Sequence, residues 1–262
     1  MGAPVINASE FAAFVLVLLR LSMVVAFAPI IGSPNIVTEA KVALALTLSF
    51  VIAPLVAYDA DLMPMTWFGF AWLAIGELIM GLTLAFMVRL VLETANLAGE
   101  YLSFQMSMTM VNLMDPQSGA QVPVVSRLVY IIFIFIFLIA NGHLVVIKAL
   151  VDSFDLVPPG LMLIWRPESF TEIIQAIGRM YILAVKIAAP VVGLLFCTKV
   201  SFGIVAKAVP QMQVLFVGMP LYILAGLALM GVSMDFWPRL VGQNLFEAQE
   251  AIKRLLTIFS PF

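Results

Sequence analysis

The chain has 262 residues, of which 63% are hydrophobic and 11% are charged, and its formal net charge is −2. Soluble domains use about 45–50% apolar and about 25% charged residues, so this composition excludes an ordinary soluble domain and indicates a protein of the membrane. The near-neutral charge and the lack of a Lys/Arg cluster also exclude a nucleic-acid-binding surface.

The N-terminal segment lacks the basic region and the cleavage site of a signal peptide, because its first basic side chain, Arg20, lies inside an apolar run. We therefore expect the mature chain to start near Met1. The single cysteine, Cys197, excludes an intramolecular disulfide, and we expect it to be a small buried hydrophobe.

Six apolar segments have the length of a membrane-spanning helix, which needs about 20 residues to cover about 30 Å. They are residues 11–31, 42–58, 67–88, 128–147, 173–198 and 212–234. Short connections predict hairpins among the first three, and the connection containing Lys199, Lys207 and Pro210 predicts a hairpin between the last two. The predicted fold class is therefore all-α, built from membrane-associated helical hairpins.

The third helix is predicted to continue past Val88 as a more polar helix. Arg89, Glu93, Asn96 and Glu100 follow helical spacing and so share one face. Two interpretations stay open. The face is either solvated at the edge of the bilayer, or it lines an aqueous channel or a neighbouring subunit, with Arg89 and Glu93 paired.

A methionine-rich loop is predicted between the third and fourth apolar segments. Its methionines alternate with Ser107 and Thr109, and Pro116 and Pro123 exclude a continuous helix. Thioethers favour Cu(I), so a copper path is one reading. The other is that adaptable methionines line or seal a pathway whose shape changes.

Four ionisable residues lie inside apolar segments, at a cost of about 2.5–3.5 kcal/mol each at a bilayer centre. They are Arg20, Glu77, Arg179 and Lys186. We expect Arg20, Glu77 and Lys186 to meet polar partners from this or another subunit. With alternating spans, each side of the membrane carries five cations among the connections, so the positive-inside rule gives no orientation.

The tail over residues 235–262 mixes charged with apolar residues at helical spacing. This pattern predicts an amphipathic helix suited to a membrane surface or a partner. No catalytic pattern occurs: there is no phosphate-binding glycine loop, no nucleophile elbow, no Cys or His pair at metal spacing, and one histidine, His143. We predict that the chain is not an enzyme and needs no cofactor or metal.

An ordered set of short motifs along nearly the whole chain resembles the FliR family of flagellar biosynthetic proteins. The motifs are Arg20 with Ala28-Pro29-Ile30, Gly99-Glu100, Gln105-Met106, Asp115-Pro116, Arg127, Asn141-Gly142-His143-Leu144, Val157-Pro158-Pro159-Gly160, Pro210-Gln211 and Gly218-Met219-Pro220-Leu221. The injectisome homologues of the family are the nearest alternative.

The resemblance implies a single export-gate domain over residues 1–262, with a FliP-like part at 1–172 and a FliQ-like hairpin and amphipathic tail at 173–262. It implies a hetero-oligomeric helical stack with FliP and FliQ, then FlhB and FlhA, in the flagellar basal body of the bacterial inner membrane, where flagellar proteins are exported. The polar residues Arg20, Glu77, Arg89, Glu93, Glu100, Arg179 and Lys186 would lie in the membrane or at subunit contacts.

The resemblance also implies a pore-occluding loop. Its residues in this sequence are Met106, Ser107, Met108, Thr109, Met110, Val111, Asn112, Leu113, Met114, Asp115 and Pro116. The predicted function is a non-enzymatic part of a protein-conducting channel. A secondary transporter and a purely structural scaffold remain alternatives, although the two halves show no repeat of the kind that transporters tend to have.

Overall fold

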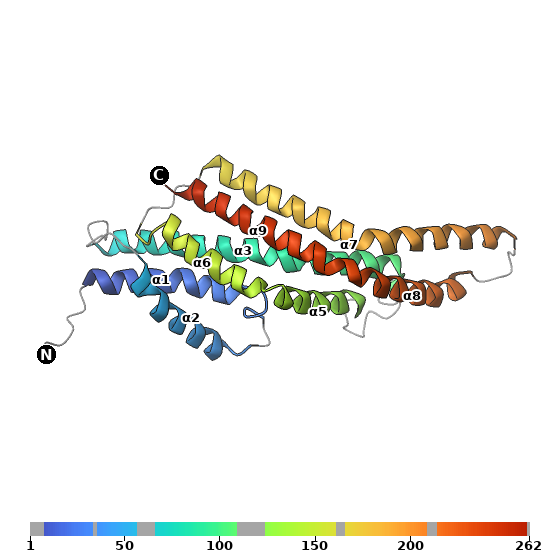
Figure 1. The fold of residues 1–262 in the computed structure, drawn as a ribbon, viewed down its shortest axis with the longest axis horizontal. Helices are drawn as coiled ribbons and strands as arrows, with labels where there is room; N and C mark the ends of the chain where they lie inside the picture. The colour runs from blue at the N-terminus through green and yellow to red at the C-terminus, as the bar shows by residue number, and fades with distance from the viewer. Residues whose placement is uncertain are drawn as a thin grey trace. The chain divides into compact units, whose positions relative to one another are not determined.

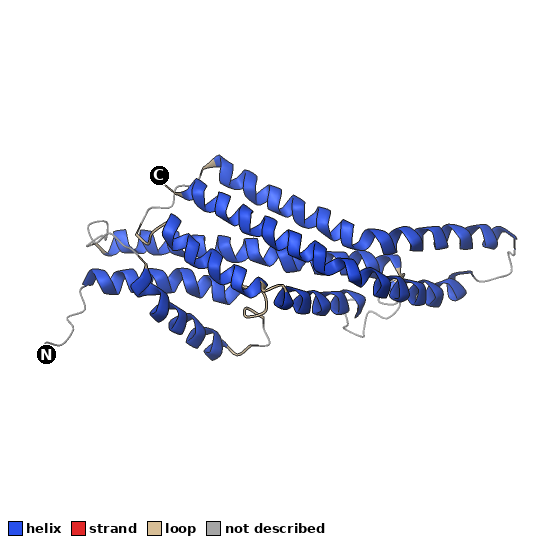
Figure 2. Cartoon of the chain, in the orientation of Figure 1, coloured by secondary structure: helices blue, strands red, loops and turns tan. Residues whose placement is uncertain are grey.

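A computed structural model describes residues 8–33, 36–56, 66–108, 124–160, 166–208 and 214–260 of the chain. Throughout these ranges the regular structure is helical, as Figures 1 and 2 show, which confirms the all-α prediction. The elements are α1 (Ala8–Phe27), α2 (Thr38–Ile52), η1 (Ala53–Leu55), α3 (Trp67–Gln105), α5 (Val124–Ile139), α6 (Gly142–Leu156), α7 (Pro167–Ala208), α8 (Val214–Ser233), η4 (Met234–Phe236) and α9 (Trp237–Phe259).

Among the described residues, five helices are long and apolar enough to cross a membrane, and the bent pair α5 and α6 would make a sixth span. The third predicted helix does continue past Val88, because α3 runs without a break to Gln105. These lengths agree with the membrane class that the composition indicates.

The apolar span predicted over residues 128–147 is present only as a broken one, because its helix is not continuous. The helix breaks at Ala140 and Asn141, between the end of α5 at Ile139 and the start of α6 at Gly142. Asn141 has φ 57°, in the left-handed region that asparagine tolerates better than most residues. The polar Asn141-Gly142 pair inside an apolar run therefore marks a helix break.

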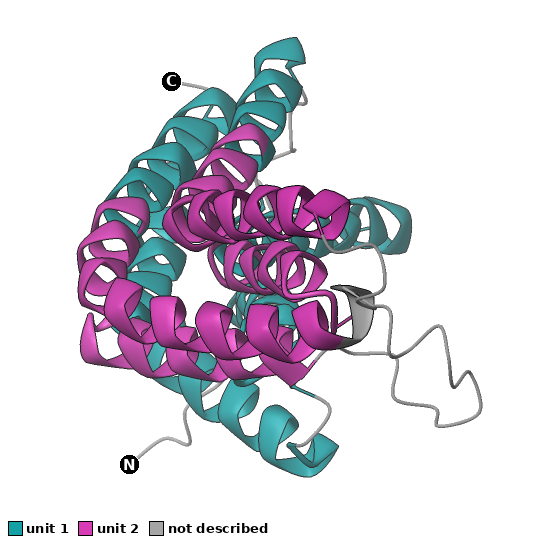
Figure 3. Cartoon of the chain, turned by 90° about the vertical axis from the view of Figure 1, so that its right-hand side faces the viewer, with its two compact units in different colours: residues 1–90, 142–177, 245–262 teal, residues 91–141, 178–244 magenta. Residues whose placement is uncertain are grey.

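The described chain forms two compact units, coloured separately in Figure 3. Unit 1 comprises residues 1–90, 142–177 and 245–262, and unit 2 comprises residues 91–141 and 178–244. Each unit is assembled from separate stretches of the sequence. The predicted division at residues 172 and 173 concerns likeness to other proteins and stays a prediction.

Each unit has its own buried core of large side chains. In unit 1 the fully buried apolar residues include Leu16, Leu21 and Met80. In unit 2 they include Phe133 and Trp237, whose ring centroids lie 5.6 Å apart. This tilted aromatic contact joins α5 to the start of α9.

The predicted amphipathic tail is helical, but its apolar face is used inside the chain. The C-terminal part of α9, in unit 1, buries Ala251, Ile252, Leu255, Leu256 and Phe259. This packing replaces the predicted exposure of that face to a membrane surface or a partner. Cys197 was also expected to be buried and is instead exposed on α7.

Candidate functional site

A buried ion pair joins two helices of unit 1. Arg20 of α1 donates from Nε to Oε2 of Glu77 on α3 at 2.6 Å and from Nη2 to Oε1 at 3.1 Å. Arg20 is 1% exposed and Glu77 is 3% exposed. The bidentate geometry satisfies both carboxylate oxygens, which a charge removed from water requires.

The remaining donors of Arg20 bind the end of α6. Nη1 donates to the carbonyl oxygen of Ser153 at 2.9 Å and to its Oγ at 3.2 Å, and Nη2 donates to the carbonyl oxygen of Val157 at 3.0 Å. All five guanidinium N–H groups thus have acceptors. The last carbonyls of a helix lack partners within it and carry negative partial charge, so a cation here caps α6.

A ring and a glycine complete this cluster. The Cζ atom of Arg20 lies 4.4 Å from the ring centroid of Phe154, which adds a cation–π contact. A Cβ atom at Gly81 would lie 2.5 Å from the carbonyl oxygen of Arg20 and 2.8 Å from Cβ of Met23. Glycine at position 81 therefore lets α1 and α3 approach closely enough for the ion pair to form.

In unit 2, the end of α3 is held where the predicted loop begins. Met106 is completely buried, and a Cβ atom at Gly226 of α8 would lie 2.5 Å from Cε and 2.7 Å from Cγ of Met106. The methionine side chain therefore occupies the space that a larger residue at Gly226 would fill. The first residue of the predicted loop is thus a packed core residue of unit 2.

Two further contacts hold the preceding residue, Gln105. Lys199 of α7 donates to Oε1 of Gln105 at 3.2 Å, and its Nζ lies 5.6 Å from the ring centroid of Tyr222 on α8. Phe202 of α7 meets the same tyrosine ring edge-on, with centroids 5.7 Å apart. Helices α7 and α8, which correspond to the predicted hairpin, therefore both pack near the end of α3.

The chain on the far side of the loop is held against α3 as well. A Cβ atom at Gly99 would lie 2.6 Å from Cα of Ser126 in the first turn of α5, and Ser126 Oγ donates to the carbonyl oxygen of Asn96 at 3.2 Å. Gly99 precedes Met106 by two helical turns, about 10 Å along the axis. Both ends of the loop are therefore fastened near the end of α3.

Ser107 ends the helix with φ 63°, a left-handed conformation common just past a helix end. The predicted loop residues Thr109, Met110, Val111, Asn112, Leu113, Met114, Asp115 and Pro116 lie outside the described residues. The contacts of Gln105, Met106 and Ser126 therefore fix the two ends of the loop, and these residues with their partners form the loop root.

The remaining predicted polar residues are distributed over both units. Arg89 and Glu100 are exposed, and Glu93 is half-buried and accepts a hydrogen bond from Asn96 Nδ2 at 2.9 Å. Arg179 is half-buried. Lys186 is exposed, and within the described ranges it has no hydrogen bond or ion pair; it lines a cavity of unit 2.

Sequence reasoning missed the three glycines that set the helix contacts. Gly81, Gly99 and Gly226 lie inside helices, where glycine costs about 1 kcal/mol relative to alanine. Small residues within membrane helices commonly mark close helix contacts, so glycines inside apolar segments could have indicated such contacts. Nothing in the sequence indicated which helix each glycine would meet.

The described residues therefore define a helical membrane protein. Its buried charges, Arg20 and Glu77, are bonded to each other inside unit 1. The residues at both ends of its central loop, Met106 and Ser126, are packed against glycines of unit 2. The chain belongs to the family of bacterial export proteins, family 1, whose model matches residues 11–248. The predicted resemblance to the FliR family is thereby confirmed.

Relatives support the same family. The flagellar biosynthetic protein FliR of Escherichia coli K12 is 29% identical over 83% of this chain and 82% of its own length. FliR of Bacillus subtilis 168 is 29% identical over 95% of this chain and 96% of its own length. FliR of Pectobacterium carotovorum is 26% identical over 92% of this chain and 91% of its own length.

Proposed function

We propose that this chain is a non-enzymatic subunit of the flagellar protein-export apparatus in the bacterial inner membrane, where its central loop helps to close the export channel. The observation that carries the proposal is family membership across residues 11–248, together with relatives named flagellar biosynthetic proteins over most of their length. These names favour the flagellar over the injectisome system.

The loop root supports a sealing role for residues 106–116. A seal must return to one place after each passage, so its ends must stay fixed while its middle yields. Two such fixed points lie within unit 2, where Met106 packs against Gly226 and Ser126 packs against Gly99. Unbranched methionines between them would pack against one another and separate without breaking strong bonds.

Partners follow from the proposed role. FliP, FliQ, FlhB and FlhA would surround the chain, and exported flagellar proteins would pass through the assembly. Large apolar side chains on α3 and α7 are exposed in the single chain, among them Trp67, Phe68 and Ile204. Such surfaces need lipid or other subunits to cover them.

Co-purification tests the assembly. The tagged chain is extracted from its own cells in mild detergent, and the intact masses of the bound proteins are measured, with an equally tagged unrelated membrane protein as control. We expect two small helical membrane proteins in a fixed ratio. Recovery of the chain alone or as a homo-oligomer would contradict the proposal.

A matched pair of variants tests the seal. Met108→Gly/Met110→Gly removes two loop side chains, whereas Ser107→Gly/Thr109→Gly adds as many glycines and keeps the methionines. Glycine suits position 107, because Ser107 has φ 63°. We expect ion leak across the inner membrane, followed with a potential-sensitive dye, only in the methionine variant. Equal leak in both, or leak in neither, would remove the methionines from the seal.

A further inference from the structure

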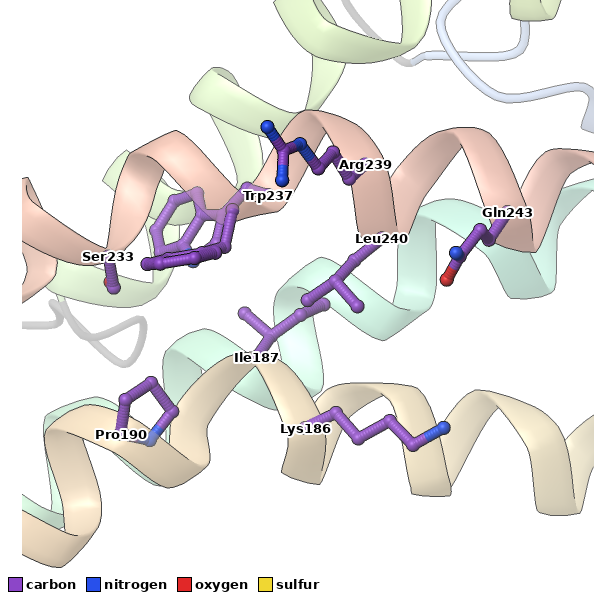
Figure 4. Close-up of a pocket in the computed structure, with 9 residues that line it drawn as sticks. Lys186, Ile187, Pro190, Ser233, Trp237, Arg239, Leu240 and Gln243 are labelled. Atoms are coloured by element: carbon purple, nitrogen blue, oxygen red, sulfur yellow. The ribbon is translucent and has the colours of Figure 1, made fainter.

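A cavity of about 420 Å³ lies within unit 2, between α7 and the stretch from the end of α8 into α9. Figure 4 shows Ile187 of α7 and Leu240 of α9 pointing toward one another across it. Its volume lies within the range of about 300–1,000 Å³ that ligand pockets occupy. None of the residues that form the loop root lines this cavity.

The lining combines apolar surface with positive charge. Five of the nine lining residues are apolar or aromatic, namely Ile187, Pro190, Phe236, Trp237 and Leu240. Lys186 and Arg239 add two cations, and no lining residue is acidic. Both cations are exposed, and neither has a hydrogen bond or ion pair to any described residue.

A buried tryptophan forms part of the cavity wall. Trp237 is 1% exposed and lines the cavity, yet its Nε1–H finds no acceptor in the described part of the chain. Tryptophans near membrane interfaces commonly have one apolar and one hydrogen-bonding end, so the indole ring suits the wall of a lipid site.

We propose that this cavity binds an anionic phospholipid. The acyl chain lies on Ile187, Pro190 and Leu240, and the headgroup meets the positive potential of Lys186 and Arg239. A lipid fits better than a free phosphate, because most of the lining is apolar and the helices have membrane-spanning length. Basic pockets between membrane helices hold acidic headgroups by the same chemistry.

Quenching of Trp237 by brominated lipid tests the proposal. The full chain carries Trp67→Phe, Trp72→Phe and Trp165→Phe, so that Trp237 is the only fluorophore of its kind. It is reconstituted in phosphatidylcholine vesicles containing increasing fractions of brominated phosphatidylglycerol or, in parallel, brominated phosphatidylcholine. We expect phosphatidylglycerol to quench Trp237 at a lower mole fraction than phosphatidylcholine does.

Charge variants separate a specific site from ordinary lipid contact. Lys186→Ala and Arg239→Ala should each reduce the preference for phosphatidylglycerol about fivefold, the effect of about 1 kcal/mol per cation. Lys186→Arg should restore it. The control Lys207→Ala, at an exposed cation near the end of α7, should leave the preference unchanged.

Three results would overturn the proposal. Equal quenching by the two lipids would mean that Trp237 meets bulk lipid without selection. No quenching by either lipid would mean that protein covers the cavity. An equal effect of Lys207→Ala would mean that total charge, rather than this site, sets the preference.

Discussion

Replacing Arg20 by methionine leaves the carboxylate of Glu77 buried without its guanidinium partner. Removing one member of a buried ion pair typically costs about 3–5 kcal/mol, because the other charge stays in a low-dielectric interior. Glu77→Met should cost a similar amount, since all five donors of Arg20 are committed to this cluster. Each single variant is therefore predicted to destabilise unit 1 strongly.

The double variant Arg20→Met/Glu77→Met should be more stable than either single variant. It buries no charge, and the carbonyl oxygen of Ser153 still accepts from the Val157 N–H at 3.0 Å. The carbonyl oxygen of Val157 loses the donor that Arg20 supplies, at a cost of about 1–3 kcal/mol. The double variant should therefore lose about 1–3 kcal/mol, far less than the two single losses added together.

The measurement is the free energy of unfolding of the full chain in mixed micelles, from helical circular dichroism as the mole fraction of dodecyl sulfate rises. Arg254→Met is the matched control, because Arg254 and Glu250 form a 4.0 Å pair on α9 whose side chains are 52% and 54% exposed. It should cost less than about 1 kcal/mol. Losses in the double variant that equal the sum of the single losses would refute the coupling.

Three other predictions follow from close contacts and backbone conformation. Gly81→Ala would push against backbone of α1 and should cost about 1–3 kcal/mol, whereas Gly178→Ala, with nothing within 4 Å, should be neutral or stabilising in the same unfolding assay. Met106→Ala should cost about 2–5 kcal/mol through the cavity it leaves, and Gly226→Ala should recover part of that loss; a further loss in the double variant would show that the two residues are not complementary. Asn141→Gly should be tolerated, because φ is 57°, while Asn141→Val should cost about 1–2 kcal/mol; equal stabilities would exclude strain at the helix break.

Much of the fold was predictable because the relevant signals are local. An apolar run of about 20 residues predicts a membrane helix whatever its neighbours are. The end of the long third helix was predicted as well, since α3 ends at Gln105, while the loop predicted over residues 106–116 lies mostly outside the described residues and stays a prediction. The break inside residues 128–147 was not predicted, because overall hydropathy indicates a span but does not show whether its helix is continuous at Asn141-Gly142.

The candidate site was predictable only in part. An arginine and a glutamate in apolar segments require partners, and this requirement could be stated from the sequence. That they would meet each other, 57 residues apart, depends on how α1 packs against α3. The capping of α6 by the same arginine adds a partner 133 residues away that no spacing rule reveals.

The sequence by itself determined the membrane class, the helical architecture and the family. Each of these depends on composition, on periodicity or on an ordered set of motifs. Only the tertiary structure decided that Met106 packs on Gly226, that Arg20 joins three helices, and that the apolar face of α9 is buried. The physical reason is that helical spacing predicts which residues share a face, whereas the partner of that face is set by how the helices pack together.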